Sequence, residues 1–301
     1  MKRGPAPDVI ICADWSKHPA RRAAYAASTA ARAVERCTPT PCTVSTLLEA
    51  ADRRRAGGTA LLGFDAPLGV PRSYLATLRD RGLTDASSFI EWLVSTPRLR
   101  DWFPPVARPR DWSVSRPFFR VQPGPGGRTR FERAAARGGI GLRRLVDQRT
   151  GAKPVFVLGV PGQVGPAAQT LWQELVEARA SGCTFSVWPF EGSLERLLSR
   201  PGVVLAEIYP RVAYAIACDV SRPVAKTQLA ARRTALDRLR HAGWLARHKV
   251  RLRHLEAADA SEDDFDACVT AAALLRLVLE KRPLATPALV DAVAEGGILG
   301  V

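Results

Sequence analysis

The stretch TALLGFDAPLG, residues 59–69, joins a buried-strand pattern to an abrupt turn. Its first six residues are almost entirely apolar, which is typical of a strand that is covered on both faces. Asp65 follows soon after, and Pro67 and Gly69 then favour a change of chain direction. The carboxylate is therefore either part of the turn or a ligand for a cation, and acids elsewhere in the chain distinguish the two.

Two other apolar runs also end on acids. Asp14 closes DVIICAD at residues 8–14, and Glu207 lies near the end of GVVLAEIYP at residues 202–210. An ionised carboxylate in apolar surroundings is costly unless it is paired or bound to a metal ion. A structural role explains each acid taken alone, whereas the repetition favours an acidic site.

The segment SEDDFD, residues 261–266, adds a fourth acidic feature at the start of an apolar helical pattern. Asp263 and Asp266 are three residues apart and share one face of the first helical turn. Acids at this place also cap a helix and complement its dipole. Together the four features predict convergent carboxylates for two hard cations, Mg²⁺ or Mn²⁺. One ion would activate water and the other would stabilise the leaving oxygen in phosphodiester hydrolysis.

The apolar periodicity along the chain predicts alternating strands and helices. Residues 20–37 are ambiguous, because their alanines favour a helix whereas the polar turns also permit two strands. A further strand is expected at residues 183–190. Helices are expected at residues 43–58, 166–181, 225–245, 261–280 and 286–294.

Positive charge dominates the chain, which has a formal net charge of +15. Much of this excess is arginine and is typical of a GC-rich genome, but 13 arginines and only four acids fall between Arg98 and Arg149, interleaved with Trp and Phe. We expect about residues 70–150 to form an inserted lid or substrate-facing segment that contacts phosphates and stacks on bases. The alternative is that these residues form a solvated helix face and a loop anchored by its aromatics. The candidate phosphate ligands are Arg108, Arg110, Arg116, Arg120, Arg128 and Arg130.

Cysteine and hydropathy patterns exclude other classes of protein. The six cysteines form no CxxC or CxxH spacing, so neither a zinc site nor a disulfide framework is predicted. The longest apolar runs are too short to span a bilayer, and the first ten residues lack a signal-like apolar core. We therefore expect a cytoplasmic protein.

Four segments carry a family resemblance: ADWS (13–16), GFDAPLGVP (63–71), AEIYPR (206–211) and EDDFDACVTAAAL (262–274). In this order they resemble the domain of unknown function 429, a family of predicted nucleases with the RNase H-like fold. The resemblance spans nearly the whole chain. It implies a single α/β domain over residues 1–301, in which a β-meander precedes parallel strands flanked by helices. It also implies that residues 20–37 belong to the meander.

The resemblance further implies an acidic metal centre. By motif position its ligands for Mg²⁺ or Mn²⁺ are Asp14, Asp65, Glu207 and Asp266, with Asp263 as a further ligand or orienting group. Whether Asp263 or Asp264 fills that place is open; the three-residue spacing to Asp266 favours Asp263.

The leading functional hypothesis is a divalent-metal-dependent nuclease that acts on DNA or RNA. Lys226 is either a cation that neutralises transition-state charge or a surface lysine. An actin-like ATPase or phosphotransferase is the second hypothesis, because DWSK at residues 14–17 resembles a phosphate-binding hairpin, although Trp15 stands where close approach to phosphate needs glycine. The third is a nucleic-acid-binding protein without catalysis.

Overall fold

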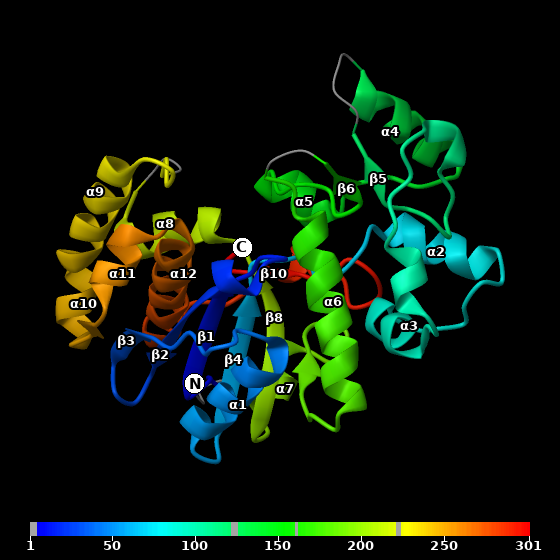
Figure 1. The fold of residues 1–301 in the computed structure, drawn as a ribbon. Helices are drawn as coiled ribbons and strands as arrows, with labels where there is room; N and C mark the ends of the chain where they lie inside the picture. Colours follow the sequence, from blue (N-terminus) through cyan, green and yellow to red (C-terminus); the bar gives the residue numbers. More distant parts are fainter. Residues whose placement is uncertain (1–4, 122–125, 160–161, 221–223) are drawn as a thin grey trace.

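A mixed β-sheet forms the centre of the protein (Figure 1). The computed structural model describes residues 5–121, 126–159, 162–220 and 224–301. Eight described strands lie in the order β10-β8-β4-β1-β2-β3-β9, with β7 paired to β8. Their bounds are β1 Val9–Asp14, β2 Ala23–Ser28, β3 Ala33–Arg36, β4 Thr59–Phe64, β7 Ser186–Val187, β8 Gly202–Ile208, β9 Arg251–Leu252 and β10 Ile298–Leu299.

Strand directions divide the sheet into two parts. β1, β2 and β3 are antiparallel neighbours, whereas β4, β8, β7 and β10 run parallel to β1. The predicted mixed α/β class and its meander are therefore confirmed, and the strand order is compatible with an RNase H-like arrangement. Residues 20–37 form strands despite their alanines because β2 is buried between two strands and against the last helix, where small side chains permit close packing.

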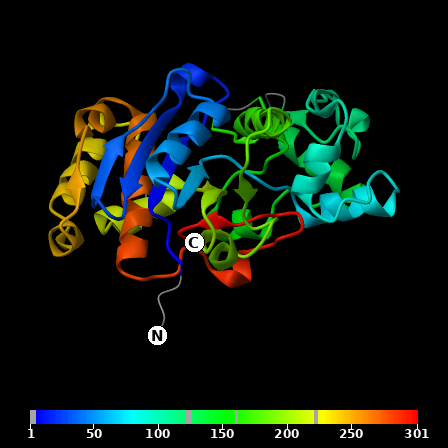
Figure 2. The ribbon, with the colours of Figure 1, turned by 90° about the horizontal axis from the view of Figure 1, so that it is seen from below.

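Helices cover both faces of the sheet (Figure 2). Ile11 of β1 points into a core shared with α1 and α6, whereas Ile10 and Cys12 point into a core shared with α8 and α12. The helices are α1 Val44–Arg55, α2 Arg72–Asp80, α3 Phe89–Ser95, α4 Gly127–Arg137, α5 Leu145–Thr150, α6 Gly165–Ala180, α7 Leu194–Leu198, α8 Pro210–Cys218, α9 Leu229–Arg240, α10 Gly243–His248, α11 Leu255–Ala260 and α12 Glu262–Leu279.

The segment expected to be an insertion contains α2 to α5, two short 3₁₀ turns (Leu99–Trp102 and Pro109–Asp111) and strand β5 (Phe119–Arg120), which pairs with β6 (Val157–Leu158). Its aromatic side chains are mostly buried. Trp102 stacks on Trp172 of α6 with ring centroids 5.5 Å apart, and Phe119 stacks on Phe131 at 4.4 Å. These four buried rings anchor the segment to the core. Burial of large aromatic rings stabilises the fold, and it leaves them unavailable to stack on bases.

Two predicted elements are wrong. The expected helix at 286–294 is a single 3₁₀ turn at Pro287–Leu289, because the Asp291 carboxylate accepts hydrogen bonds from the backbone N–H groups of Val293 and Ala294 at 2.7 and 2.8 Å and so competes with helix formation. The strand expected at 183–190 is reduced to the two residues of β7. Among the described residues, no helix combines the length and hydropathy needed to cross a bilayer.

Candidate metal centre

Asp14 and Asp65 lie side by side at the carboxyl ends of two parallel strands. Asp14 is the last residue of β1, and Asp65 is the first residue after β4. The strands pair with Ala13 opposite Phe64, and the Asp65 N–H donates to the Ala13 carbonyl at 2.9 Å. The ladder therefore extends by one bond and fixes both acids at one edge of the sheet.

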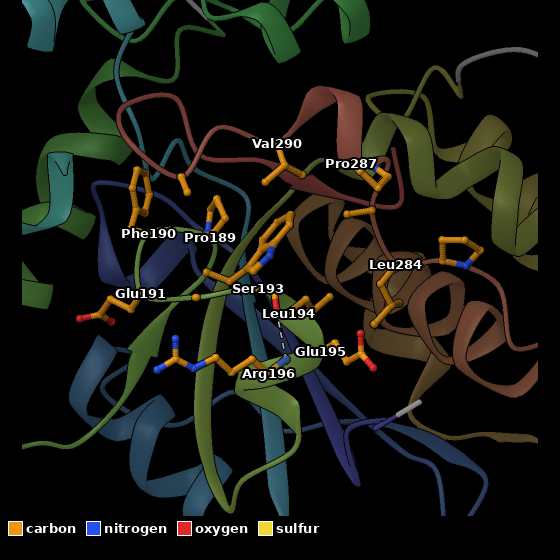
Figure 3. Close-up of a pocket in the computed structure, with 15 residues that line it drawn as sticks. Pro189, Phe190, Glu191, Ser193, Leu194, Glu195, Arg196, Leu284, Pro287 and Val290 are labelled. Atoms are coloured by element: carbon orange, nitrogen blue, oxygen red, sulfur yellow. Dashed lines mark hydrogen bonds between the residues drawn. The ribbon is translucent and has the colours of Figure 1, made fainter. Parts of the chain in front are cut away.

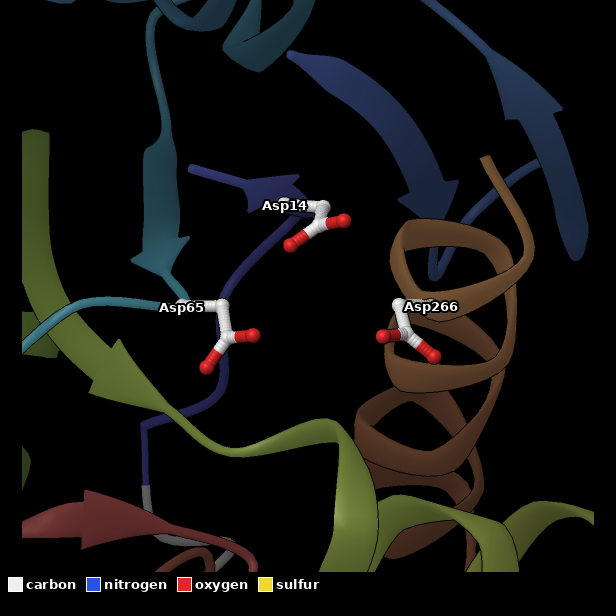
Figure 4. Close-up of side chains that lie close together, drawn as sticks. All are labelled: Asp14, Asp65 and Asp266. Atoms are coloured by element: carbon white, nitrogen blue, oxygen red, sulfur yellow. The ribbon is translucent and has the colours of Figure 1, made fainter. Parts of the chain in front are cut away.

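Asp266 reaches the same place from α12, which packs on β1 and β2. Asp14, Asp65 and Asp266 each offer one carboxylate oxygen, and these oxygens lie within 4.8 Å of one another (Figure 4). A divalent cation bound at 2.0–2.6 Å holds its ligand oxygens no more than about 5 Å apart, and hard cations prefer carboxylates. The three aspartates, called the aspartate trio below, therefore fit one shared Mg²⁺ or Mn²⁺ ion.

Both carboxylate oxygens of Asp266 already have a hydrogen-bond partner. The Tyr214 hydroxyl of α8 donates to Oδ1, and the Lys226 ammonium donates to Oδ2. The Asp266 side chain is only 1% exposed, so these donors replace the water that it loses on burial. Lys226 thus belongs to the site predicted from the sequence.

Negative charge accumulates in the aspartate trio. Burial raises the pKa of Asp14 well above its usual value, and Asp65 and Asp266 raise it further. Burial together with the charge of Asp266 raises the pKa of Asp65 to about 7. Although burial alone would lower the pKa of Lys226, the carboxylates of Asp266 and Asp14 raise it, so its ammonium is charged at neutral pH. The site therefore has a deficit of positive charge that a cation would relieve.

The residue after Asp14 holds the end of β1 in place. The Trp15 side chain is 4% exposed, lies edge-to-face on Phe64 of β4 and carries the Arg22 guanidinium 3.6 Å above its ring. Arg22 in turn donates to the Cys42 carbonyl at 2.8 Å and forms an ion pair with Glu174 at 2.9 Å. Trp15 is a packing residue that fixes the strand ends from which Asp14 and Asp65 project.

Glu207, predicted as a fourth ligand, is not in the aspartate trio. Its two oxygens accept hydrogen bonds from the Arg144 guanidinium at 2.6 and 2.7 Å, and one also accepts from the Leu68 N–H at 3.0 Å. Arg144 is fully buried and also binds Asp147 at 2.7 Å. Burial alone would lower the pKa of Arg144, but the two carboxylates raise it above its ordinary value. The structure therefore pairs Glu207 with a protein cation rather than placing it as a metal ligand.

Neither Asp263 nor Asp264 joins the trio. Asp263 is partly exposed and lies 3.8 Å from the Arg21 guanidinium, whereas Asp264 accepts from Arg36 at 2.6 Å. The predicted role of Asp263 as a ligand or orienting group is not supported by this arrangement. Its negative charge still raises the pKa of Asp14 and Asp266.

The six predicted phosphate ligands lie in the insertion and are not part of the trio. Arg116, Arg120 and Arg130 are exposed. The other three pair with acids of their own segment: Arg108 and Arg110 with Asp111, and Arg128 with Glu132. In Figure 1 the insertion lies on the side of the sheet toward which β4 and β8 point, which is also the side of the aspartate trio.

Sequence reasoning missed three residues of this region: Arg144, Asp147 and Tyr214. Arg144 and Asp147 are three residues apart, the same spacing as the exposed pair Arg108 and Asp111. No local signal separates the buried pair from the exposed one.

A separate hollow of about 910 Å³ lies between the β7–α7 segment and the C-terminal segment (Figure 3). Its walls are mostly apolar and include Trp188, Phe190, Leu284 and Val290. None of the predicted site residues lines it, so it is distinct from the aspartate trio.

Comparisons with known proteins add no relative: no family model, curated protein or solved structure matches the chain. The resemblance to the domain of unknown function 429 therefore stays a prediction, and any function has to be argued from the site.

Proposed function

We propose that the protein is a divalent-metal-dependent hydrolase of phosphodiester bonds in nucleic acid, built on an RNase H-like sheet. The convergence of Asp14, Asp65 and Asp266 carries the proposal. These acids come from β1, from the end of β4 and from the last long helix, which is the arrangement implied by the resemblance to the predicted nucleases.

The proposed division of work follows from the contacts. Asp14, Asp65 and Asp266 hold a Mg²⁺ or Mn²⁺ ion, which activates water and stabilises charge on phosphate oxygens when it is bound. Tyr214 and Lys226 fix the orientation of the Asp266 carboxylate. The Lys226 ammonium, whose side chain is 35% exposed, also offers positive charge to a phosphate that approaches the trio.

The nature of the substrate is proposed from charge. A formal net charge of +15 favours a polyanion, and nucleic acid is a polyanion with hydrolysable phosphodiester bonds. The exposed arginines of the insertion, Arg116, Arg120 and Arg130, supply phosphate contacts, since the insertion lies on the side of the sheet toward which β4 and β8 point (Figure 1). The buried aromatics of the insertion supply no base stacking, which favours contact through the backbone over recognition of bases.

Cleavage assays test this function. Purified protein is incubated with single-stranded DNA, duplex DNA and RNA in Mg²⁺, in Mn²⁺ and in a chelator. We expect metal-dependent cleavage of at least one substrate, and a loss of about 100-fold or more in Asp14→Asn and Asp266→Asn, since each removes a metal ligand.

Asp85→Asn is the matched control, because Asp85 is an exposed acid outside the site and its loss changes the net charge by the same amount. Cleavage that persists unchanged in Asp14→Asn and Asp266→Asn contradicts the assignment. Absence of cleavage on all three substrates, with metal binding retained, would separate a metal-binding site from nuclease function.

A further inference from the structure

The charges of the site balance with a single divalent ion. The aspartate trio carries three negative charges when ionised, and Lys226 contributes one positive charge through its contact with Asp266. The difference is two negative charges, which one Mg²⁺ or Mn²⁺ ion neutralises. A second divalent ion would give the site an excess of positive charge unless further acids took part.

Two further acids near the trio are paired with arginines: Asp263 lies 3.8 Å from the Arg21 guanidinium, and Glu207 binds Arg144. Glu207 is the nearest candidate by strand position, since it pairs with Phe64, the residue before Asp65. Its two oxygens are both held by the buried Arg144 guanidinium. Release of Glu207 would leave Arg144 with Asp147 alone in a buried environment, which is costly.

Lys226 is a fixed part of the site and is held through its backbone. Its carbonyl oxygen accepts from the Arg232 guanidinium at 2.6 Å, and its N–H donates to the Val224 carbonyl at 2.9 Å. Arg232 is 6% exposed and also donates to the Asp259 carbonyl at 3.2 Å, so the segment is tied to α9 and to the end of α11. The lysine is therefore positioned by the fold before any ion binds.

From these contacts we propose that the site binds one divalent cation and that the Lys226 ammonium supplies the second positive charge, in the place where a second metal ion would otherwise act. The inference rests on the proposed function and replaces the two-ion arrangement expected from the sequence. It assigns Lys226 a direct role toward the phosphate in addition to its contact with Asp266.

Titration calorimetry with Mn²⁺ tests the inference without using activity. We expect the wild-type protein to bind one Mn²⁺ ion at the site. Lys226→Met should bind Mn²⁺ about tenfold or more tightly, because the change removes a positive charge a few ångströms from the ion. Lys226→Gln keeps a hydrogen-bond donor for Asp266 and should show the same direction, which guards against a folding defect in Lys226→Met.

Lys153→Met is the control, because Lys153 is an exposed lysine of a loop and its loss should leave Mn²⁺ affinity unchanged. Two Mn²⁺ ions bound by the wild-type site, or unchanged or weaker binding in both Lys226 variants, would overturn the inference while leaving a metal-dependent function in place. Absence of Mn²⁺ binding by the wild-type protein would overturn the metal-dependent function itself.

Discussion

Two groups of acids gather near the carboxyl ends of β1, β4 and β8, and they differ in how their charge is balanced. The aspartate trio collects three carboxylates with one lysine, whereas Glu207 and Asp147 share the guanidinium of Arg144. We call the second group the arginine network. Asp14, Asp65 and Glu207 all lie at or next to the end of an apolar strand, so their sequence patterns are alike. A strand-end acid is therefore a candidate ligand only where the fold leaves its charge unbalanced.

The arginine network also supports the trio. Glu207 accepts from the Leu68 N–H, and Leu68 lies in the turn that follows Asp65. Trp172 of α6 donates from its indole N–H to the Pro67 carbonyl at 2.9 Å. The turn after β4 is thus held from two sides, which fixes the chain that carries Asp65. In GFDAPLG the turn residues therefore position the Asp65 carboxylate, so the turn and the candidate ligand act together.

The largest expected effect on stability comes from the arginine network. Arg144→Met leaves two buried carboxylates without their cation and should lower the free energy of unfolding by about 3–5 kcal/mol. Urea unfolding followed by circular dichroism measures this loss. As a matched control, Arg128→Met breaks a partly exposed pair on α4 and should cost less than about 1 kcal/mol. Equal losses in the two variants would show that burial of the network does not matter.

The trio should make the free energy of unfolding fall as pH rises, whereas a carboxylate in a salt bridge makes it rise. The pKa of Asp65 is raised to about 7 in the folded protein. In chelator its protonated form therefore adds stability that is fully present below pH about 4 and is lost as pH rises to about 7. Asp65→Asn cannot ionise and should raise the free energy of unfolding at pH 8 by about 2–4 kcal/mol relative to the wild type, with little change at pH 4.

Thermal unfolding in chelator across this pH range checks the prediction, and added Mn²⁺ should reverse the order by stabilising only the wild type. Asp85→Asn, which replaces an exposed acid, serves as the control and should follow the wild-type curve. If stability in chelator falls by the same amount between pH 4 and pH 8 in Asp65→Asn and in the wild type, Asp65 does not carry the effect.

A smaller effect is expected at Tyr214. Tyr214→Phe removes the hydroxyl that donates to Asp266 and should cost about 1–2 kcal/mol of stability, since a buried acceptor loses one partner. Mn²⁺ affinity should rise about two- to threefold, because the freed oxygen is more available to the ion. Tyr25→Phe, which removes a donor to the His254 carbonyl, should lower stability without changing Mn²⁺ affinity. Identical Mn²⁺ affinities in the two variants would remove Tyr214 from the site.

The sequence predicts the three acids of the trio, although it adds Glu207 to them, because the positions of the three follow from local rules. Apolar runs that end on Asp14 and Asp65 mark the carboxyl ends of strands, and neighbouring parallel strands bring such ends together. Asp266 lies in the first turns of an apolar helix, which has to pack on the sheet. The apolar pattern also predicts alternating strands and helices, and the family resemblance predicts the meander.

The arginine network could not be predicted because its pairing is not local. Arg144 and Glu207 are 63 residues apart in the chain. The chain contains 44 basic residues, and nothing in the residues around Arg144 marks it as buried. The burial of the insertion's aromatics could not be predicted for the same reason. A Trp or Phe beside arginines has the same sequence pattern whether it packs into a core or faces a ligand.

Mn²⁺ binding to Asp65→Asn and Glu207→Gln, compared by titration calorimetry at pH 7.5, tests the central contrast most directly. We expect Asp65→Asn to weaken binding by about 100-fold or more, whereas Glu207→Gln should stay within about threefold of the wild type. Wild-type affinity in Asp65→Asn, or an equal loss in both variants while each remains folded, would contradict it.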